Sequence, residues 1–193
     1  MENQPSSAIE EVQYAGRLSN YYYNRWSCIT NDKTILSWSR GYKLNFSEPV
    51  QQNSTPVVPN YSLNESAQYE AAISDLFRIG AVSTCEPCQD QFISGIFLRP
   101  KPNGKMRFIL NLKNLNILYI VTNHFKLDDL RTVLNLISKD CLMDLKDAYF
   151  LVKIHEDSRK YLRFMFKNTI YEFNALPFGL YTAPYIVTKM LRP

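Results

Sequence analysis

The sequence predicts a fold of the α+β class. Two local patterns are mixed along its 193 residues: apolar residues at steps of three and four, and short β-branched or aromatic runs between turn residues. Helix-like and strand-like segments do not alternate regularly, which argues against a parallel α/β sheet. The composition, 46% hydrophobic, 21% charged and 13% aromatic, excludes disordered and fibrous classes.

The first predicted helix lies near the amino terminus. Ser7 and Glu10 stand in capping-box register. An apolar stripe follows at Val12, Ala15, Leu18, Tyr22 and Trp26. The tyrosines at 21–23 are candidates for a base-stacking surface, but aromatic residues on such a stripe more often belong to a core, and we predict a core role.

A linker and a second helix are predicted next. Residues 47–60 contain three prolines among polar residues and no periodicity, which favours a linker. Ser62 or Asn64 can cap a helix that ends at Gly80. One face of this helix is formed by Tyr69, Ala72, Ile73, Leu76 and Phe77.

Hairpins dominate the rest of the chain. Segments 92–99 and 106–112 read as strands joined by a turn around Gly104, and 161–166 and 170–173 read as a second hairpin. Between the hairpins, 126–137 has helical spacing and 141–145 reads as a buried strand. Thr182 can cap a last helix with Pro184 in its first turn.

Charge divides the chain unequally. Residues 1–90 hold six Lys/Arg and ten Asp/Glu, a net of −4, whereas residues 91–193 hold sixteen and eight, a net of +8. This split favours a polyanionic partner for the second half, with a solvated basic face as the alternative. No apolar run suits a membrane span and no export signal is recognisable, so we expect no membrane association, an intracellular protein and reduced cysteines.

Three short segments contain residue types suited to phosphate chemistry. Asp144 ends an apolar strand and Asp147 follows it, an arrangement that suits a hard divalent cation or, alternatively, helix capping. Lys101, Lys105 and Arg107 on one hairpin suit a triphosphate, although edge strands also carry such charges to prevent aggregation. The loop ALPFGLYTAP allows close backbone approach to a ligand, as does any tight strand-to-helix connection.

The order of these segments carries a family resemblance. KPNGKMRFILNLKNLN, HFKLDDL, MDLKDAYFLVKI, RKYLRFMF and YEFNALPFGLYTAPYIVTKML follow one another at compatible spacing. This order resembles the fingers and palm of reverse transcriptases, especially those of gypsy-like and DIRS-like retrotransposons, from about Glu65 to Pro193. AGRLSN and ILSW…GYKLNF also look like the sequence that precedes the polymerase in such elements.

The resemblance implies roles for the residues after the predicted palm strand. Asp144 matches the catalytic carboxylate that bridges two Mg²⁺ ions, and the backbone of Leu145 would add a metal contact. Asp147 would lie beside the triphosphate in a mainly structural role. Tyr149 matches the steric gate that selects deoxynucleotides.

Further roles are implied for the basic hairpin and the helix after it. Lys101 and Arg107 match finger residues that hold the β- and γ-phosphates, and Lys105 belongs to that group less clearly. Lys113 and Asn116 match positions along the template path, where contacts with phosphate and sugar set the register.

The loop near the end of the chain completes the implied site. Phe178 and Gly179 look like the segment that packs against the incoming nucleotide and the template base; some viral relatives carry Gln in place of Phe178. Arg159, Lys160 and Arg163 add positive charge near the same surface, facing either nucleic acid or water.

Other metal and acid–base candidates are weaker. Cys85 and Cys88 form a CxxC pair, but no second pair completes a zinc site at a usual spacing. His124 and His155 are possible general acids, yet both lie in segments that the resemblance treats as scaffold.

The resemblance also implies an incomplete site. In the family, further catalytic carboxylates come from a Tyr-x-Asp-Asp hairpin after the helix that begins near Thr182, and the sequence ends at Pro193. Asp128 and Asp129 read as a solvated helix face and do not replace them. We therefore expect weak Mg²⁺ binding, no activity of these residues alone, and an exposed edge on the strand at 142–144.

Together these inferences predict a partial right-hand polymerase, comprising the fingers and the first part of the palm. Residues 1–46 would form an amino-terminal helical segment, 47–60 a linker and 61–193 the partial reverse-transcriptase domain. Expected partners are RNA or DNA template with primer, deoxynucleoside triphosphates, and a carboxy-terminal palm, thumb and RNase H. The alternatives are a non-catalytic nucleic-acid-binding remnant or an interaction domain without a nucleic-acid role. The compartment, cytoplasm or nucleus, stays open.

Overall fold

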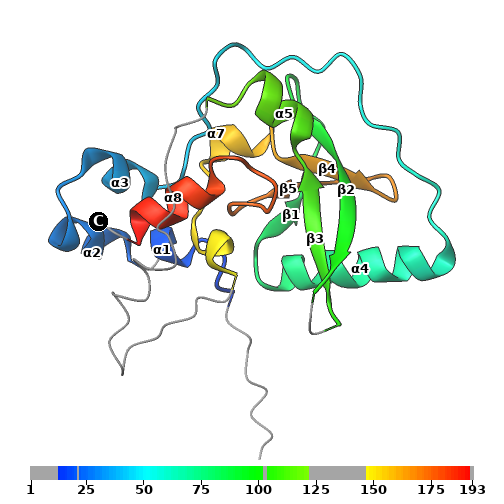
Figure 1. The fold of residues 1–193 in the computed structure, drawn as a ribbon, viewed down its shortest axis with the longest axis horizontal. Helices are drawn as coiled ribbons and strands as arrows, with labels where there is room; N and C mark the ends of the chain where they lie inside the picture. Colours follow the sequence, from blue (N-terminus) through cyan, green and yellow to red (C-terminus); the bar gives the residue numbers. More distant parts are fainter. Residues whose placement is uncertain (1–12, 21, 102–103, 122–146, 192–193) are drawn as a thin grey trace, which may run out of the picture.

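A computed structural model of the chain describes residues 13–20, 22–101, 104–121 and 147–191. Helices and strands are mixed, which confirms the predicted α+β class (Figure 1). The elements are α1 (Arg17–Asn20), α2 (Tyr23–Ile29), α3 (Lys33–Trp38), α4 (Leu63–Arg78), β1 (Val82–Thr84), β2 (Ile93–Pro100), β3 (Met106–Asn111), α5 (Lys113–Leu118), η1 (Ala148–Leu151), α7 (Glu156–Arg159), β4 (Arg163–Phe166), β5 (Thr169–Phe173) and α8 (Ala183–Met190).

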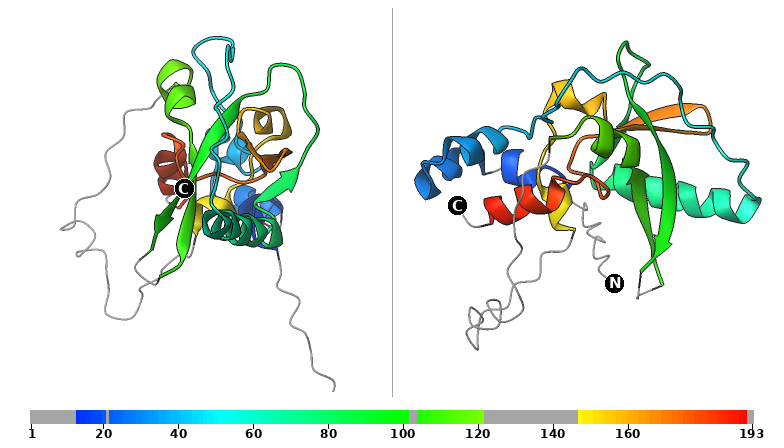
Figure 2. Two further views of the ribbon diagram at one scale, coloured as in Figure 1. Left: turned by 90° about the vertical axis from the view of Figure 1, so that its right-hand side faces the viewer. Right: turned by 45° about the horizontal axis from the view of Figure 1, so that its top comes forward.

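A five-stranded sheet in the order β1-β5-β4-β2-β3 forms the centre of the fold. Neighbouring strands are antiparallel except β2 and β4, which pair in parallel through Ile93 with Arg163 and Ser94 with Phe164. Both predicted hairpins are confirmed, β2–β3 and β4–β5. The long β2–β3 hairpin projects from the sheet beside α4, on the side away from α1 to α3 (Figures 1 and 2).

A tight turn of two residues joins β4 to β5. Lys167 and Asn168 both adopt positive φ, 46° and 63°, between the paired residues Phe166 and Thr169. Two consecutive left-handed residues give the turn a twist that matches the twist of the flanking strands. The prediction of a turn at 167–169 is therefore confirmed to within one residue.

Helix α4 follows its predicted signals closely. Ser62 and Glu65 form a complete capping box, and Gly80 after the helix adopts φ +78°. Ile73 and Leu76 are buried, as predicted. Phe77 is 49% exposed, so its assignment to the same apolar face is wrong. One residue beyond Leu76 turns the side chain by about 100° around the helix, away from the sheet.

The amino-terminal helix is interrupted. Two short helices, α1 and α2, stand where one longer helix was expected, and Ser7 and Glu10 lie outside the described residues. Trp26 is buried as predicted, whereas Tyr22 is 43% exposed, so the core role predicted for it is wrong. Its ring lies under the Arg17 guanidinium, 5.9 Å from the centroid, an arrangement that needs no burial.

The segment 47–60 contains no helix or strand and crosses over α5 on its way to α4 (Figure 1). Its first part is anchored. Val50 is buried, and the Gln52 side-chain amide exchanges two hydrogen bonds of 2.7 Å with the backbone of Ile93. The Tyr119 hydroxyl donates to the carbonyl of Gln51 at 2.6 Å.

Helix α8 begins after Thr182, with Pro184 in its first turn, as predicted. The expected side-chain cap is absent at Thr182, which has helical φ and ψ. The Thr182 hydroxyl instead lies 3.4 Å from the donating hydroxyl of Tyr42. The Thr182 hydroxyl therefore accepts a tertiary hydrogen bond from Tyr42 and does not cap α8.

One hydrophobic cluster joins the amino-terminal helices to the sheet and α8. It includes Trp26 of α2, Ile35 of α3, Phe164 of β4 and Ile186 of α8. Residues of the predicted segments 1–46 and 61–193 therefore belong to one hydrophobic core. None of the helices that the structure describes is long and apolar enough to cross a membrane.

Five described elements were not predicted individually: α3, which lies within the predicted helical segment 1–46, and β1, α5, η1 and α7. Each has at most six residues, too few for an apolar period to be visible in the sequence. The helix and strand predicted at 126–137 and 141–145 lie outside the described residues.

Candidate nucleotide-binding cleft

A cleft of about 270 Å³ lies between the β2–β3 hairpin, α4 and η1. Segments from five separate parts of the sequence line it, and they include five of the residues that the resemblance assigns to nucleotide or nucleic-acid binding. The lining residues are Tyr14, Ala72, Asp75, Leu76, Arg78, Ile79, Lys101, Lys105, Met106, Arg107, Phe108, Asp147, Phe150 and Phe178.

The basic wall of the cleft comes from the tip of the β2–β3 hairpin. The amide of Lys101 donates to the carbonyl of Lys105 at 2.7 Å and closes the hairpin. Lys105 directly precedes β3 and Arg107 lies within it, two residues further on. Side chains two residues apart along a strand point to the same face of the hairpin. The three cationic residues of the hairpin, Lys101, Lys105 and Arg107, all line this cleft.

Asp147 contributes a carboxylate to the cleft, and this carboxylate faces Lys101 of the basic wall. It adopts a left-handed conformation, φ +51°, which Asp tolerates better than most residues and which turns the chain into η1. Its Oδ1 lies 3.9 Å from the Lys101 ammonium, and its Oδ2 accepts a hydrogen bond of 3.1 Å from the Tyr14 hydroxyl. Each carboxylate oxygen therefore faces a different partner.

The environment of Tyr14 keeps its hydroxyl protonated. Burial, followed by the negative charge of Asp147 and the hydrogen bond to it, raises the pKa of Tyr14 to about 12. The phenol therefore stays a donor to the carboxylate over the whole physiological range.

Phe150 and Phe178 line the cleft, whereas Tyr149 is not among the lining residues and contacts Phe178. The Phe178 ring centroid is 5.0 Å from that of Tyr149 and 5.5 Å from that of Phe150. The Arg107 guanidinium lies over Phe178 at 5.0 Å from its centroid. This cation–π contact keeps the guanidinium of the exposed residue Arg107 next to the ring.

The loop that carries Phe178 is fixed by close contact with β3. Gly179 adopts φ +111°, and a Cβ at this position would lie 2.3 Å from the carbonyl oxygen of Leu110. Asn116 of α5 clamps the same loop: its side-chain amide donates to Gly179 O at 2.7 Å and accepts from Tyr181 N at 3.1 Å. The glycine is thus required by contact, not only by turn geometry.

Asn116 is only 3% exposed. The resemblance implies a contact of Asn116 with the template, but its buried side-chain amide already binds the loop that carries Phe178. This geometry favours a role in positioning the loop over a direct contact with the template. Lys113, at the start of α5, is exposed and available to solvent.

The expected metal ligands Asp144 and Leu145 lie outside the described residues. Among the residues that are described, Asp75 and Asp147 offer the oxygen donors that Mg²⁺ prefers. However, Asp75 accepts from Arg78 at 3.0 Å, and Asp147 faces Tyr14 and Lys101. Within the described part of the chain, no three His, Cys, Asp or Glu side chains lie together as a group that could hold a metal ion.

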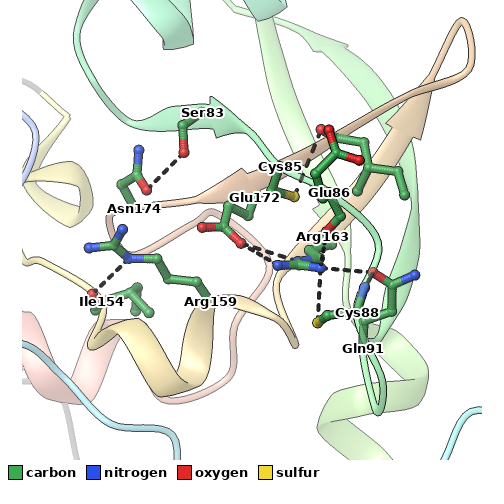
Figure 3. Close-up of polar contacts among 11 residues, drawn as sticks. Ser83, Cys85, Glu86, Cys88, Gln91, Ile154, Arg159, Arg163, Glu172 and Asn174 are labelled. Carbon is green, nitrogen blue, oxygen red and sulfur yellow. Dashed lines mark hydrogen bonds and ion pairs between the residues drawn. The ribbon is translucent and has the colours of Figure 1, made fainter.

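Arg163 does not belong to the basic surface that the sequence suggests. Its side chain is 8% exposed and donates two bonds to Glu172, of 3.1 and 2.7 Å (Figure 3). Its remaining donors reach Gln91 Oε1 at 2.8 Å, Glu86 O at 3.1 Å and Cys88 Sγ at 3.2 Å (Figure 3). Because this charge is buried and paired, it holds the sheet to the loop before β2.

The other two residues of that group also lie apart from the cleft. The Arg159 Nε–H donates to the carbonyl of Ile154 at 3.4 Å (Figure 3), and the Lys160 ammonium lies over the Tyr161 ring at 5.2 Å. Neither residue is among those that line the cleft.

The remaining titratable candidates have local partners. The Cys85 thiol faces Ile170 O at 3.8 Å, and burial raises its pKa to about 11. Cys88 accepts from Arg163. The imidazole of His155 accepts from Asp157 N at 3.3 Å and caps α7, whereas His124 lies outside the described residues.

Sequence reasoning missed Tyr14, Asp75 and Arg78 as lining residues. The signal that could have suggested Tyr14 is its place directly before AGRLSN, one of the segments that carry the resemblance. Nothing in the sequence shows that this segment reaches the hairpin.

Comparison with known proteins shows what the second half of the chain is similar to. Residues 99–193 match the family described as reverse transcriptase (RNA-dependent DNA polymerase). This region is related to the reverse transcriptases of retrotransposon and retroviral Pol polyproteins, and it contains most of the cleft residues apart from Tyr14 and those of α4.

The relatives are long polyproteins, and the chain matches only a small part of each. The chain is 27% identical over 157 residues to the retrovirus-related Pol polyprotein from transposon opus of Drosophila melanogaster, covering 77% of the chain and 15% of that protein. It is 24% identical over 147 residues to the genome polyprotein of Petunia vein clearing virus, and 22% identical over 143 residues to the Tf2-3 polyprotein of Schizosaccharomyces pombe. These matches cover 72% of the chain and 7% and 10% of the two polyproteins.

Solved structures support the fold. The foamy viral protease–reverse transcriptase in complex with dsDNA superposes with a TM-score of 0.60 at 17% identity, over 78% of this chain and 31% of that one. The native prototype foamy virus enzyme gives a TM-score of 0.59 at 17% identity, over 77% and 20%. The chain thus has a partial reverse-transcriptase fold.

Proposed function

We propose that this chain forms the fingers and the first part of the palm of an RNA-directed DNA polymerase, and that its cleft binds a deoxynucleoside triphosphate. One observation carries the proposal. The cleft brings Lys101, Lys105, Arg107, Asp147 and Phe178 together from three separate segments, and the family resemblance assigns all five to nucleotide or nucleic-acid binding.

The chemistry of the cleft suits a triphosphate. Arg107 offers a planar fork of donors for phosphate oxygens, and Lys101 adds a compact charge at the same end. Phe178 and Tyr149 form an aromatic surface beside them on which a sugar and a base can pack. The steric gate against a 2′-hydroxyl that the resemblance assigns to Tyr149 is part of this proposal, and the contact of its ring with Phe178 places it next to a lining residue.

Template and primer would lie along the exposed positive charge next to the cleft. Lys113 and Lys105 are exposed, and the half of the chain that contains them has a net charge of +8. Contacts of this kind neutralise phosphates and release counterions, so binding weakens with salt.

Asp144 and the backbone of Leu145 would hold Mg²⁺ in this proposal. The ion, when bound, would activate the primer hydroxyl and stabilise the charge that develops on the transferred phosphate. We also propose that these 193 residues, assayed alone, do not complete the reaction, because they contain no Tyr-x-Asp-Asp motif.

The direct test is binding of a deoxynucleoside triphosphate to the full 193-residue chain, measured by isothermal titration calorimetry with Mg²⁺ present. The Lys101→Ala/Arg107→Ala variant should raise the dissociation constant about tenfold or more, since charge-assisted phosphate contacts are lost. The matched control, Arg25→Ala/Lys33→Ala, removes the same charges from the exposed surface of α2 and α3 and should leave affinity unchanged. Equal loss in both variants, or no binding by the parent, would refute the proposed cleft.

Two further assays separate the alternatives. Lys113→Ala should weaken binding to a primed template and lower the salt slope of log K by about one. A chain that binds neither primed template nor triphosphate would instead be an interaction domain. In primer extension, the 193 residues should incorporate no nucleotide; incorporation that survives Asp144→Asn would remove Asp144 from the catalytic role.

A further inference from the structure

Residues that precede the reverse-transcriptase match form part of the cleft. Ala15 N donates to Ile79 O at the end of α4 at 3.1 Å, and Gly16 N donates to Phe150 O of η1 at 2.7 Å. Two consecutive amides therefore fasten this segment to two different walls of the cleft. Tyr14, directly before them, lines the cleft itself.

The position of Tyr14 fixes one half of the Asp147 carboxylate. Its hydroxyl donates to Oδ2 at 3.1 Å, while the Lys101 ammonium lies 3.9 Å from Oδ1. The distance to Lys101 is at the outer limit of an ion pair. A carboxylate free to turn would gain Coulomb energy by closing on the ammonium, because attraction increases as distance falls and the side chains of Lys101 and Asp147 are only 28% and 19% exposed.

We propose that Tyr14 is a positioning residue of the triphosphate site: by holding Asp147, it keeps the Lys101 ammonium available for a phosphate group. This inference rests on the proposed function of the cleft. Without the phenolic hydroxyl, Asp147 closes on Lys101, and an incoming triphosphate must then break that ion pair before it can bind.

The high pKa of Tyr14, about 12, agrees with a hydroxyl that remains a donor throughout the pH range of the assay. The segment at 13–16 lies outside the matched residues 99–193, so the inference assigns a role in the nucleotide site to a part of the chain that the family match does not include.

The test is a double-mutant cycle on triphosphate affinity, using the full chain and dATP with Mg²⁺. Tyr14→Phe removes one oxygen and keeps the ring, and it should raise the dissociation constant about three- to tenfold, the value of one hydrogen bond. In the Asp147→Ala background the same substitution should have no effect, because Tyr14 then has no carboxylate to hold. Tyr23→Phe is the control: it removes a hydroxyl that accepts from Arg40 at 2.6 Å, in α2.

Each outcome decides the inference. Equal affinity of Tyr14→Phe and the parent would overturn it while leaving the proposed cleft intact. An equal loss in both backgrounds, or a melting temperature that falls with the affinity, would show a structural role of Tyr14 that does not act through Asp147. A parent chain that binds no dATP would remove the proposed function and this inference with it.

Discussion

Gly179 is the residue whose substitution tests the cleft geometry most directly. Alanine there must adopt φ +111°, and its Cβ would lie 2.3 Å from the Leu110 carbonyl oxygen. Real Cβ atoms almost never come closer than 3.0 Å, so the loop must move by about 0.7 Å against β3. Backbone strain costs about 1–3 kcal/mol, and an overpacked contact costs about 1–3 kcal/mol more. We expect Gly179→Ala to lower the free energy of unfolding by about 3 kcal/mol.

Gly104→Ala provides the control, since Gly104 also has positive φ, +77°, but a Cβ there meets nothing within 4 Å. It should lose only about 1–2 kcal/mol, the cost of the left-handed conformation. Urea unfolding of both variants gives the difference, and dATP affinity reports the position of Phe178, which moves with Gly179. Equal losses of stability, or a Gly179→Ala variant that binds dATP like the parent, would refute the reasoning.

Three further predictions concern the scaffold. Asn116→Ala should lower the free energy of unfolding by about 2 kcal/mol, because a buried loop clamp is lost; a change within error in urea unfolding would contradict this. Cys85 should resist iodoacetamide at pH 8, since burial raises its pKa to about 11 and the thiolate forms only as pH approaches that value, whereas exposed Cys88 reacts; equal labelling in peptide mass spectra would contradict it. Leu76→Ala should cost about 2–5 kcal/mol and Phe77→Ala about 1 kcal/mol or less, as measured by thermal unfolding; the reverse order would restore the predicted apolar face.

Local signals were sufficient wherever neighbours in sequence made the structure. Ser62 and Asn64 were the two predicted caps of α4, and Ser62 is the one that caps it; Gly80 predicted the end of the helix, because caps and stops act within four residues. Hairpin prediction succeeded for the same reason: the strands are joined by short turns whose residues favour them. Thr182 marks the limit of such reasoning, since its hydroxyl contacts distant Tyr42 instead of capping α8.

Electrostatic roles could not be assigned from residue type alone. Arg163 and Arg107 are both basic residues on strands of one sheet, yet Arg163 is buried against Glu172 and Arg107 lines the cleft. The difference depends on which face of the sheet each side chain leaves and on which loops cover that face. Neither property is encoded within a few residues of the arginine.

By itself, the sequence determined the α+β class, two hairpins, the bounds of α4, and the order of motifs that resembles a reverse transcriptase, because each depends on short-range spacing or on linear order. Only the tertiary structure decided that Tyr14 reaches Asp147, 133 residues away, and that Asn116 turns inward to clamp the loop of Gly179. Contacts across such separations form when burial of the shared hydrophobic core brings the segments together. Several residues of the cleft can therefore be predicted from the sequence, but their arrangement around the cleft depends on tertiary packing.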